Sequence, residues 1–200
     1  MAKARNGRRA GLACLLVPVM ILTHGSGAMA NDDLARKVEQ LERRLAEAEA
    51  RLAVQQVITT YGLAADTNDI PAMMALWTDD CVIEIDGTVI AQGREQSRRI
   101  IESEVHQSIQ PYSAHVMGPF RIDVIDADHA VATGYQTVYV REGRKPEGRS
   151  QVWRQSFGRW ELRRTGERWE IARRQSRAVT HPGIREIVEP TLRGVEKAAN

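Results

Sequence analysis

The sequence has few of the residues on which metal, nucleotide and redox chemistry depend. Two cysteines in 200 residues are too few for a fold held together by disulfides. The chain has no glycine-rich phosphate loop, no H-E-x-x-H pair, no Cys-x-x-Cys pair and no G-x-S-x-G turn. We therefore expect no metal and no cofactor.

An excess of charge of one sign is also missing. Lys and Arg total 28 against 26 Asp and Glu, a net charge of +2, and the body of the chain has no basic block of the kind that binds nucleic acid. The chain is 42% hydrophobic and 27% charged, as a globular protein is and a disordered chain is not. We expect no nucleic-acid partner.

Only one long apolar run is present, and it lies near the start of the chain. Basic residues precede it, the run covers residues 10–23 (AGLACLLVPVMILT), and Ala28-Met29-Ala30 follows as a small-residue cleavage pattern. This order predicts a secretory signal peptide over residues 1–30 and an exported, periplasmic or secreted protein. The alternative is a membrane anchor, but a bilayer span needs roughly 20 residues, so we expect no stable span.

Cleavage near Ala30 changes the length, the net charge and the cysteine count of the protein. It leaves about 170 residues with 24 Lys and Arg, 26 Asp and Glu, and one cysteine, Cys81. The mature protein is then mildly acidic and has no internal disulfide. Its histidines are His106, His115, His129 and His181.

Residues 31–51 have apolar residues at alternating steps of four and three, with Glu and Arg between them. This spacing predicts a heptad helix, the pattern of a coiled coil. The helix either joins copies of the chain into a dimer or trimer or lies along the domain. The apolar positions are Leu34, Val38, Leu41, Leu45, Ala48 and Leu52.

Residues 52–180 have helical patterns first and alternating strand patterns afterwards. This order predicts an α+β fold, in which a curved antiparallel sheet wraps around the N-terminal helices as a cone whose open end suits a small molecule. Residues 181–200 form a tail. Helices are expected up to about residue 65, at 71–77 and at 93–109, and strands at 81–86, 88–91, 115–125, 129–140, 151–164 and 168–179.

Two polar residues lie in apolar surroundings. Asp66 follows Leu63-Ala64-Ala65, where a buried carboxylate needs a partner. His115 begins a strand between Ala114 and Val116. If Asp66 orients His115, the imidazole becomes a general base. The alternatives, a residue at a helix end and a structural histidine, remain open.

Other polar and aromatic residues have weaker signals. Tyr61 lies on a helix face adjacent to that of Asp66, and alternation sends one of Arg173 and Arg174 toward the interior. His106 and His129 lie in polar segments and are expected at the surface. The tryptophans are expected in the core: Trp77, Trp153, Trp160 and Trp169.

An ordered set of motifs resembles the SnoaL-like branch of the nuclear transport factor 2-like cone fold. The resemblance covers Leu52 to Val179 and implies this fold, which hosts isomerases, dehydratases, hydrolases and plain binding proteins. The motifs are Tyr61-Gly62-Leu63-Ala64-Ala65-Asp66, Ala75-Leu76-Trp77-Thr78-Asp79-Asp80, Gly93-Arg94-Glu95, Ala114-His115-Val116-Met117-Gly118 and Gly166-Glu167-Arg168-Trp169 through Arg174.

Within this fold the pattern is similar to scytalone dehydratase, bile-acid dehydratase and hexachlorocyclohexane dehydrochlorinase. The resemblance implies that Asp66 and His115 abstract a proton, that Tyr61 binds an oxygen and that Arg174 stabilises negative charge. Ile85 stands where ketosteroid isomerase has its base, so that chemistry is disfavoured. The residues expected to bind substrate are Trp77, Ile85, Met117 and Gln136.

The leading hypothesis is a cofactor-independent, dehydratase-like lyase for a hydrophobic, ring-containing small molecule. Three alternatives stay open: an exported binding protein for a hydrophobic ligand, a ketosteroid isomerase-like isomerase, and an interaction module carried by the heptad helix.

Overall fold

The computed structural model describes residues 25–198 and the side chains of residues 31–193. Most of the predicted signal peptide, residues 1–24, lies outside the described residues. The chain divides into two units between Glu42 and Arg43. Helix α1 (Gly25–Thr67) begins in the first unit and ends in the second. None of the described helices is both long and apolar enough to cross a membrane.

The described part of the first unit is helical, and its heptad residues are exposed. Leu34, Val38 and Leu41 show 59%, 45% and 60% of their surface to solvent. Lys37 pairs with Asp33 at 3.1 Å on the same stretch. The apolar stripe therefore has no cover within this unit, and its contact with a second copy stays a prediction.

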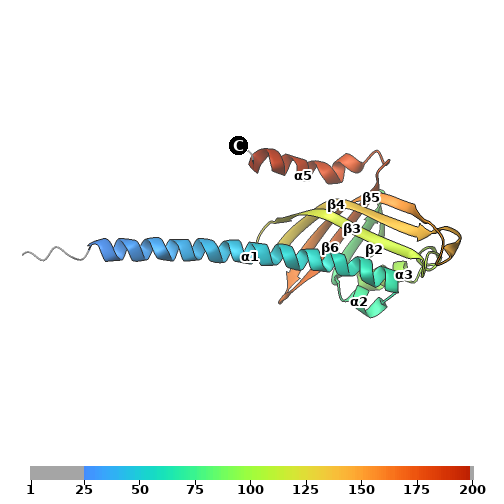
Figure 1. Cartoon of the computed structure of the whole chain (residues 1–200), viewed down its shortest axis with the longest axis horizontal. Helices are drawn as coiled ribbons and strands as arrows, with labels where there is room; N and C mark the ends of the chain where they lie inside the picture. The colour runs from blue at the N-terminus through green and yellow to red at the C-terminus, as the bar shows by residue number, and fades with distance from the viewer. Residues whose placement is uncertain (1–24, 199–200) are drawn as a thin grey trace, which may run out of the picture. The chain divides into compact units, whose positions relative to one another are not determined.

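The second unit is built on a sheet of six strands in the order β2-β1-β6-β5-β4-β3 (Figure 1). Four further helices and a short 3-10 turn, η1, complete it. The strands are β1 (Trp77–Ile85), β2 (Thr88–Gln92), β3 (Ser113–Val124), β4 (His129–Arg141), β5 (Ser150–Thr165) and β6 (Arg168–Ala178); the helices are α2 (Ile70–Met74), α3 (Arg94–Ile101), α4 (Glu104–Gln107) and α5 (Ile184–Ala198), and η1 covers Glu142–Arg144.

The sheet confirms the predicted α+β class but is mixed rather than wholly antiparallel. β1 and β6 pair in parallel, with Ile83 opposite Arg174, while the other neighbours are antiparallel. β2 and β3 lie at the two edges, so the sheet is open. Parallel pairing was missed because β1 and β6 are far apart in the sequence, and hairpin signals report only local pairs.

Two of the predicted helices differ in extent from the helices that the structure shows. The helix expected to include Trp77 ends as α2 at Met74, and Trp77 begins β1. The helix expected over residues 93–109 is two helices, because the Ser103 hydroxyl caps α4 by accepting from the His106 N–H at 3.3 Å.

The core lies between α1 and one face of the sheet, the inner face. Ile58 and Tyr61 of α1 are buried there with Trp77 and Trp160. α5 packs on the other, outer face, where the hydroxyls of Thr191 and Thr133 lie 2.9 Å apart. The helices and the sheet thus enclose an inner face toward which polar side chains of the strands can point.

Close contact between α1 and β3 depends on Gly62. A Cβ atom at this position would lie 2.7 Å from the backbone oxygen of His115 and 3.0 Å from the Met117 side chain. Any larger residue would push the helix away from the strand. The missing side chain therefore brings the end of α1, with Asp66, up to His115.

Candidate active site

Asp66 and His115 form a hydrogen-bonded pair. Asp66 is the penultimate residue of α1 and His115 the third residue of β3. Their Oδ1 and Nδ1 atoms lie 2.6 Å apart, and the His115 backbone N–H donates to Oδ2 at 2.7 Å. Because a carboxylate only accepts, Nδ1 is the donor, and Nε2 of the neutral ring holds the free lone pair. No described residue hydrogen-bonds to Nε2.

The Asp66 carboxylate is held in its ionised form. Burial acts to raise the pKa of Asp66, but hydrogen bonds from the His115 ring and backbone and from Ser113 outweigh it and lower this pKa below its ordinary value. The side chains of His115 and Asp66 are only 12% and 24% exposed. A carboxylate in this position fixes the tautomer of the imidazole.

A second chain of hydrogen bonds, through Gln110 and Ser113, also holds Asp66 in place. The Gln110 amide donates to the Ala65 carbonyl at 2.9 Å and to the Ser113 hydroxyl at 3.0 Å. The Ser113 hydroxyl then donates to Oδ1 of Asp66 at 3.0 Å. Sequence reasoning missed Gln110 and Ser113, because polar residues around Pro111 look like an ordinary turn.

The prediction that His106 lies at the surface was wrong. Only 9% of His106 is exposed, and its Nε2 lies 3.2 Å from the Ala65 carbonyl, with its ring centre 6.0 Å from that of His115. The break before α4 turns it inward. Burial and the charge of a protonated His115 lower the pKa of His106, so it favours the neutral form. His129 is exposed, as predicted, and pairs with Asp126 at 2.9 Å.

Arg174 lies on the inner face and has no acidic partner among the described residues. Its guanidinium carbon is 5.4 Å from the ring centre of Tyr61 and 5.1 Å from that of Trp160. Its neighbour Arg173 donates instead to Glu84 on the outer face, at 2.7 Å. Because side chains alternate between the two faces along β6, Arg174 lies on the same face as His115 and Arg173 lies on the opposite face.

The SnoaL-like domain family matches residues 46–175, about two thirds of the chain. The chain belongs to the SnoaL-like domain family. No curated protein sequence matches it significantly.

Solved structures agree with this SnoaL-like assignment. A nuclear transport factor 2-like protein with a cystatin-like fold from Novosphingobium aromaticivorans superposes with a TM-score of 0.67 at 28% identity, covering 74% of this chain and 94% of that one. The hexachlorocyclohexane dehydrochlorinase LinA-type3 from Novosphingobium barchaimii gives 0.58 at 17%, covering 68% and 90%. A proposed scytalone dehydratase from N. aromaticivorans gives 0.57 at 16%, covering 68% and 87%.

The predicted substrate-binding residues of this SnoaL-like domain differ in their access to a ligand. Trp77 is buried, and its ring centre lies 6.1 Å from that of Tyr61, so it supports Tyr61 from behind. Met117 and Ile85 are half-buried on the inner face. Gln136 is buried and donates to the Ser156 and Ser176 hydroxyls, at 3.1 and 2.9 Å. Unlike the other tryptophans, Trp153 is exposed, contrary to prediction.

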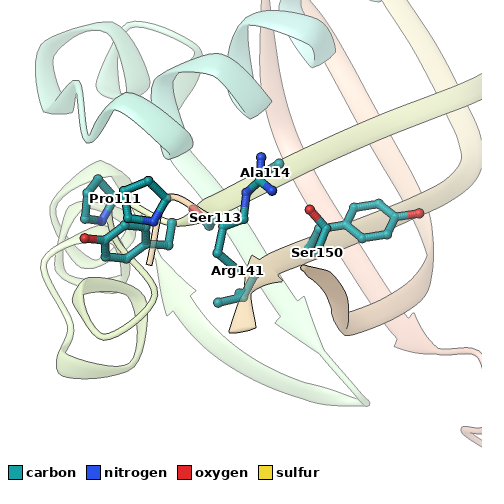
Figure 2. A pocket seen from close by; sticks show the side chains of 9 residues that line it. Pro111, Ser113, Ala114, Arg141 and Ser150 are labelled. Atoms are coloured by element: carbon teal, nitrogen blue, oxygen red, sulfur yellow. The ribbon is translucent and has the colours of Figure 1, made fainter. Parts of the chain in front are cut away.

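A cavity of about 450 Å³ lies beside Ser113, close to the Asp66–His115 pair but not lined by either residue (Figure 2). Its wall includes Tyr112, Tyr139 and Arg141. Among the residues with described side chains, no group of three or more His, Cys, Asp or Glu is placed to hold a metal ion. The acid–base and hydrogen-bonding groups of this SnoaL-like site are Asp66, His115, Tyr61 and Arg174.

Proposed function

We propose that this SnoaL-like domain is a cofactor-independent lyase of the dehydratase type, acting on a hydrophobic, ring-containing molecule. The observation that carries the proposal is the 2.6 Å contact between Asp66 and His115. It assigns the ring proton to Nδ1 and leaves Nε2 as a base inside a mostly buried site.

The elimination assigns a role to each inner-face group. Nε2 of His115 removes a proton from a carbon atom of the substrate, and Asp66 stabilises the imidazolium that forms. The electron pair of the broken C–H bond forms a C=C bond as the neighbouring C–O bond breaks. The imidazolium returns the proton to the leaving oxygen, which departs as water. Tyr61 donates to that oxygen, and Arg174 stabilises the negative charge that develops.

Two structural neighbours have names that fit the proposed reaction class, but they do not identify the substrate. A dehydrochlorinase and a proposed scytalone dehydratase are both eliminating enzymes by name, and both have this fold. At 16–17% identity they establish the fold alone. The assignment to this chain therefore depends on Asp66 and His115.

A panel of steroid-like and polyketide-like hydroxy compounds tests the proposal, with turnover followed as loss of water by mass. We expect His115→Ala to lower turnover about 10³-fold, the usual scale for a general base. His129→Ala is the matched control, because His129 also pairs with an aspartate, Asp126, but at the surface. Equal turnover by wild type and His115→Ala would remove His115 from the mechanism.

A binding protein for a hydrophobic ligand is the second candidate. The observation in its favour is that the cavity beside Ser113 is lined by neither Asp66 nor His115. Saturable binding of panel compounds with no product from any of them would favour this role. An isomerase of the ketosteroid type is less well supported, since the family resemblance puts Ile85, which cannot transfer protons, at the position of the base.

We also propose that the protein is exported and cleaved near Ala30. The support is the basic start, the apolar run of residues 10–23 and the Ala28-Met29-Ala30 pattern. The intact mass of protein recovered from the periplasm tests this proposal. A mature chain that begins at Asn31 is expected, and an uncleaved chain in the cytoplasm contradicts it.

The heptad helix is proposed to join copies of the chain. Its apolar residues are exposed within one copy, as at Leu34 and Leu41. The triple variant Leu34→Gln, Val38→Gln, Leu41→Gln is expected to lower the mass in solution to that of one chain. The control, Arg36→Gln with Gln40→Ala, changes the opposite side of the helix. An unchanged mass in the triple variant would exclude this contact.

A further inference from the structure

Three buried polar atoms on the inner face have no hydrogen-bond partner among the described residues. One is Nε of Arg174, and the other two are the indole Nε1 of Trp160 and the amide Oε1 of Gln136. Trp160 is 0% exposed and Gln136 is 4% exposed. A buried donor and a buried acceptor without partners destabilise a fold, and such pairs are uncommon in native proteins.

The two atoms meet above Gly158 of β5. A Cβ atom at Gly158 would lie 2.9 Å from Nε1 of Trp160 and 3.2 Å from Oε1 of Gln136. Both atoms therefore approach the same point above Gly158, where the Cβ atom of any other residue would press against them. The Gln136 amide nitrogen donates to both Ser156 and Ser176, and this orientation turns Oε1 away from the serines.

The unpaired atoms are chemically complementary to one kind of group. An indole N–H donates and an amide oxygen accepts. A hydroxyl group accepts from the first and donates to the second, so a single hydroxyl satisfies both. A carbonyl oxygen would satisfy only Trp160, and a hydrocarbon or a halogen would leave both without a strong partner.

We propose that Trp160 and Gln136 form a hydroxyl-binding subsite above Gly158, and that the substrate has a ring hydroxyl that binds there. The subsite rests on the proposed function only in placing the substrate on the inner face. Arg174 is the cross-strand neighbour of Trp160, and its guanidinium lies against the indole ring. The inner face can therefore hold one hydroxyl at the subsite and a second, more negative oxygen at Arg174. This excludes substrates that have no oxygen.

Phenol and toluene test the subsite, since they match in shape and differ in a hydroxyl against a methyl group. In a ¹⁵N-labelled protein, the four tryptophans give four indole N–H signals, and the signal absent from Trp160→Phe is that of Trp160. We expect phenol to shift this signal with an affinity at least tenfold higher than that of toluene. The signal of the exposed Trp153 is the internal control and should not move.

Two substitutions, at Gln136 and at Gly158, test whether these residues cause the preference for phenol over toluene. Gln136→Met removes the acceptor and should reduce the preference for phenol to less than twofold, while Gln155→Met, at an exposed position on the same sheet, should keep it. Gly158→Ala places a methyl group against both atoms and should abolish the phenol shift. A Trp160 signal that ignores phenol, as it would if the two atoms only hold a tightly bound water, overturns the subsite. So does an equal response to toluene.

The same titration on His115→Ala separates this proposal from the proposed function. If His115→Ala keeps full turnover and still prefers phenol, the lyase mechanism fails and the subsite stands. If turnover falls but wild type shows no preference for phenol, the mechanism stands and the subsite fails.

Discussion

Two neighbouring arginines of β6 have opposite environments. Arg173 faces outward and shares Glu84 with Arg177, and Gln175 donates to the same carboxylate at 3.2 Å. Arg174 faces inward and contacts two aromatic rings but no carboxylate. Arg173 thus has a carboxylate partner, and Arg174 has none among the residues that the structure describes.

This difference separates structural polar groups from groups available to a ligand. Burial acts to raise the pKa of Glu84, but the hydrogen bonds from Arg177 and Arg173 outweigh it and lower this pKa, so the outer cluster is charged and self-contained. On the inner face, Nε2 of His115 and the Arg174 guanidinium keep unused hydrogen-bonding capacity. A buried group that is left unpaired costs stability unless something binds to it.

The largest effect is expected at the inner face, from Asp66→Asn. An amide can donate to Nδ1 and so favour the wrong tautomer, which would place the ring proton on Nε2, the atom that acts as the base. Turnover should fall about 10³-fold or more. Steady-state kinetics measure this, with Asp126→Asn as the matched change at the exposed Asp–His pair. A fall of less than tenfold would contradict the assigned role of Asp66.

On the outer face, Arg177→Met should act on stability and not on turnover. It leaves Glu84, which is only 9% exposed, with fewer partners for its charge. Removing one partner of a buried ion pair costs about 3 kcal/mol of the free energy of unfolding. Urea denaturation measures the loss, and Arg99→Met is the control because Arg99 and its partner Glu95 are both 71% exposed. Loss of turnover per folded molecule would mean that the two faces are not independent.

Arg174→Met should have the opposite effect, lowering turnover and leaving the free energy of unfolding nearly unchanged. No carboxylate is left unpaired, so the free energy of unfolding should change by no more than about 1 kcal/mol, the scale of a cation–π contact. Turnover should fall about 10²-fold, as when a group that stabilises developing charge is removed. Comparing kinetics and urea curves for Arg174→Met and Arg173→Met tests the contrast directly. A variant that loses several kcal/mol with normal turnover would make Arg174 structural.

A smaller effect is expected in acid. The pKa of Asp66 is lowered in the folded protein from an ordinary value of 3.8. Its ionised form therefore stabilises the fold above about pH 4, and this contribution is lost as the pH falls through the lowered pKa. Denaturation curves between pH 6 and pH 2, compared with those of Asp66→Asn, should converge at the acid end. A constant difference across that range would exclude the linkage.

The sequence predicted the residue types of the inner face better than their contacts. The apolar surroundings of Asp66 and His115 singled out the two residues, and the family resemblance implied that they act as a pair. Ser113 and Gln110 were missed because hydrogen bonds between a turn and a helix end leave no periodic signal. The unpaired atoms of Trp160 and Gln136 depend on which residues face each other across three strands, and strand register is set by long-range packing.

Gly62 has a consequence for how such a site could be adjusted. The contact between α1 and β3 is backbone against backbone there, and the His115 oxygen would lie 2.7 Å from a Cβ atom at this position. The distance between the Asp66 carboxylate and the His115 imidazole thus depends on how closely the backbone of α1 approaches β3 at Gly62, four residues before Asp66. A single added methyl group would work as a spacer, retuning the proton-transfer geometry while every reacting group keeps its identity.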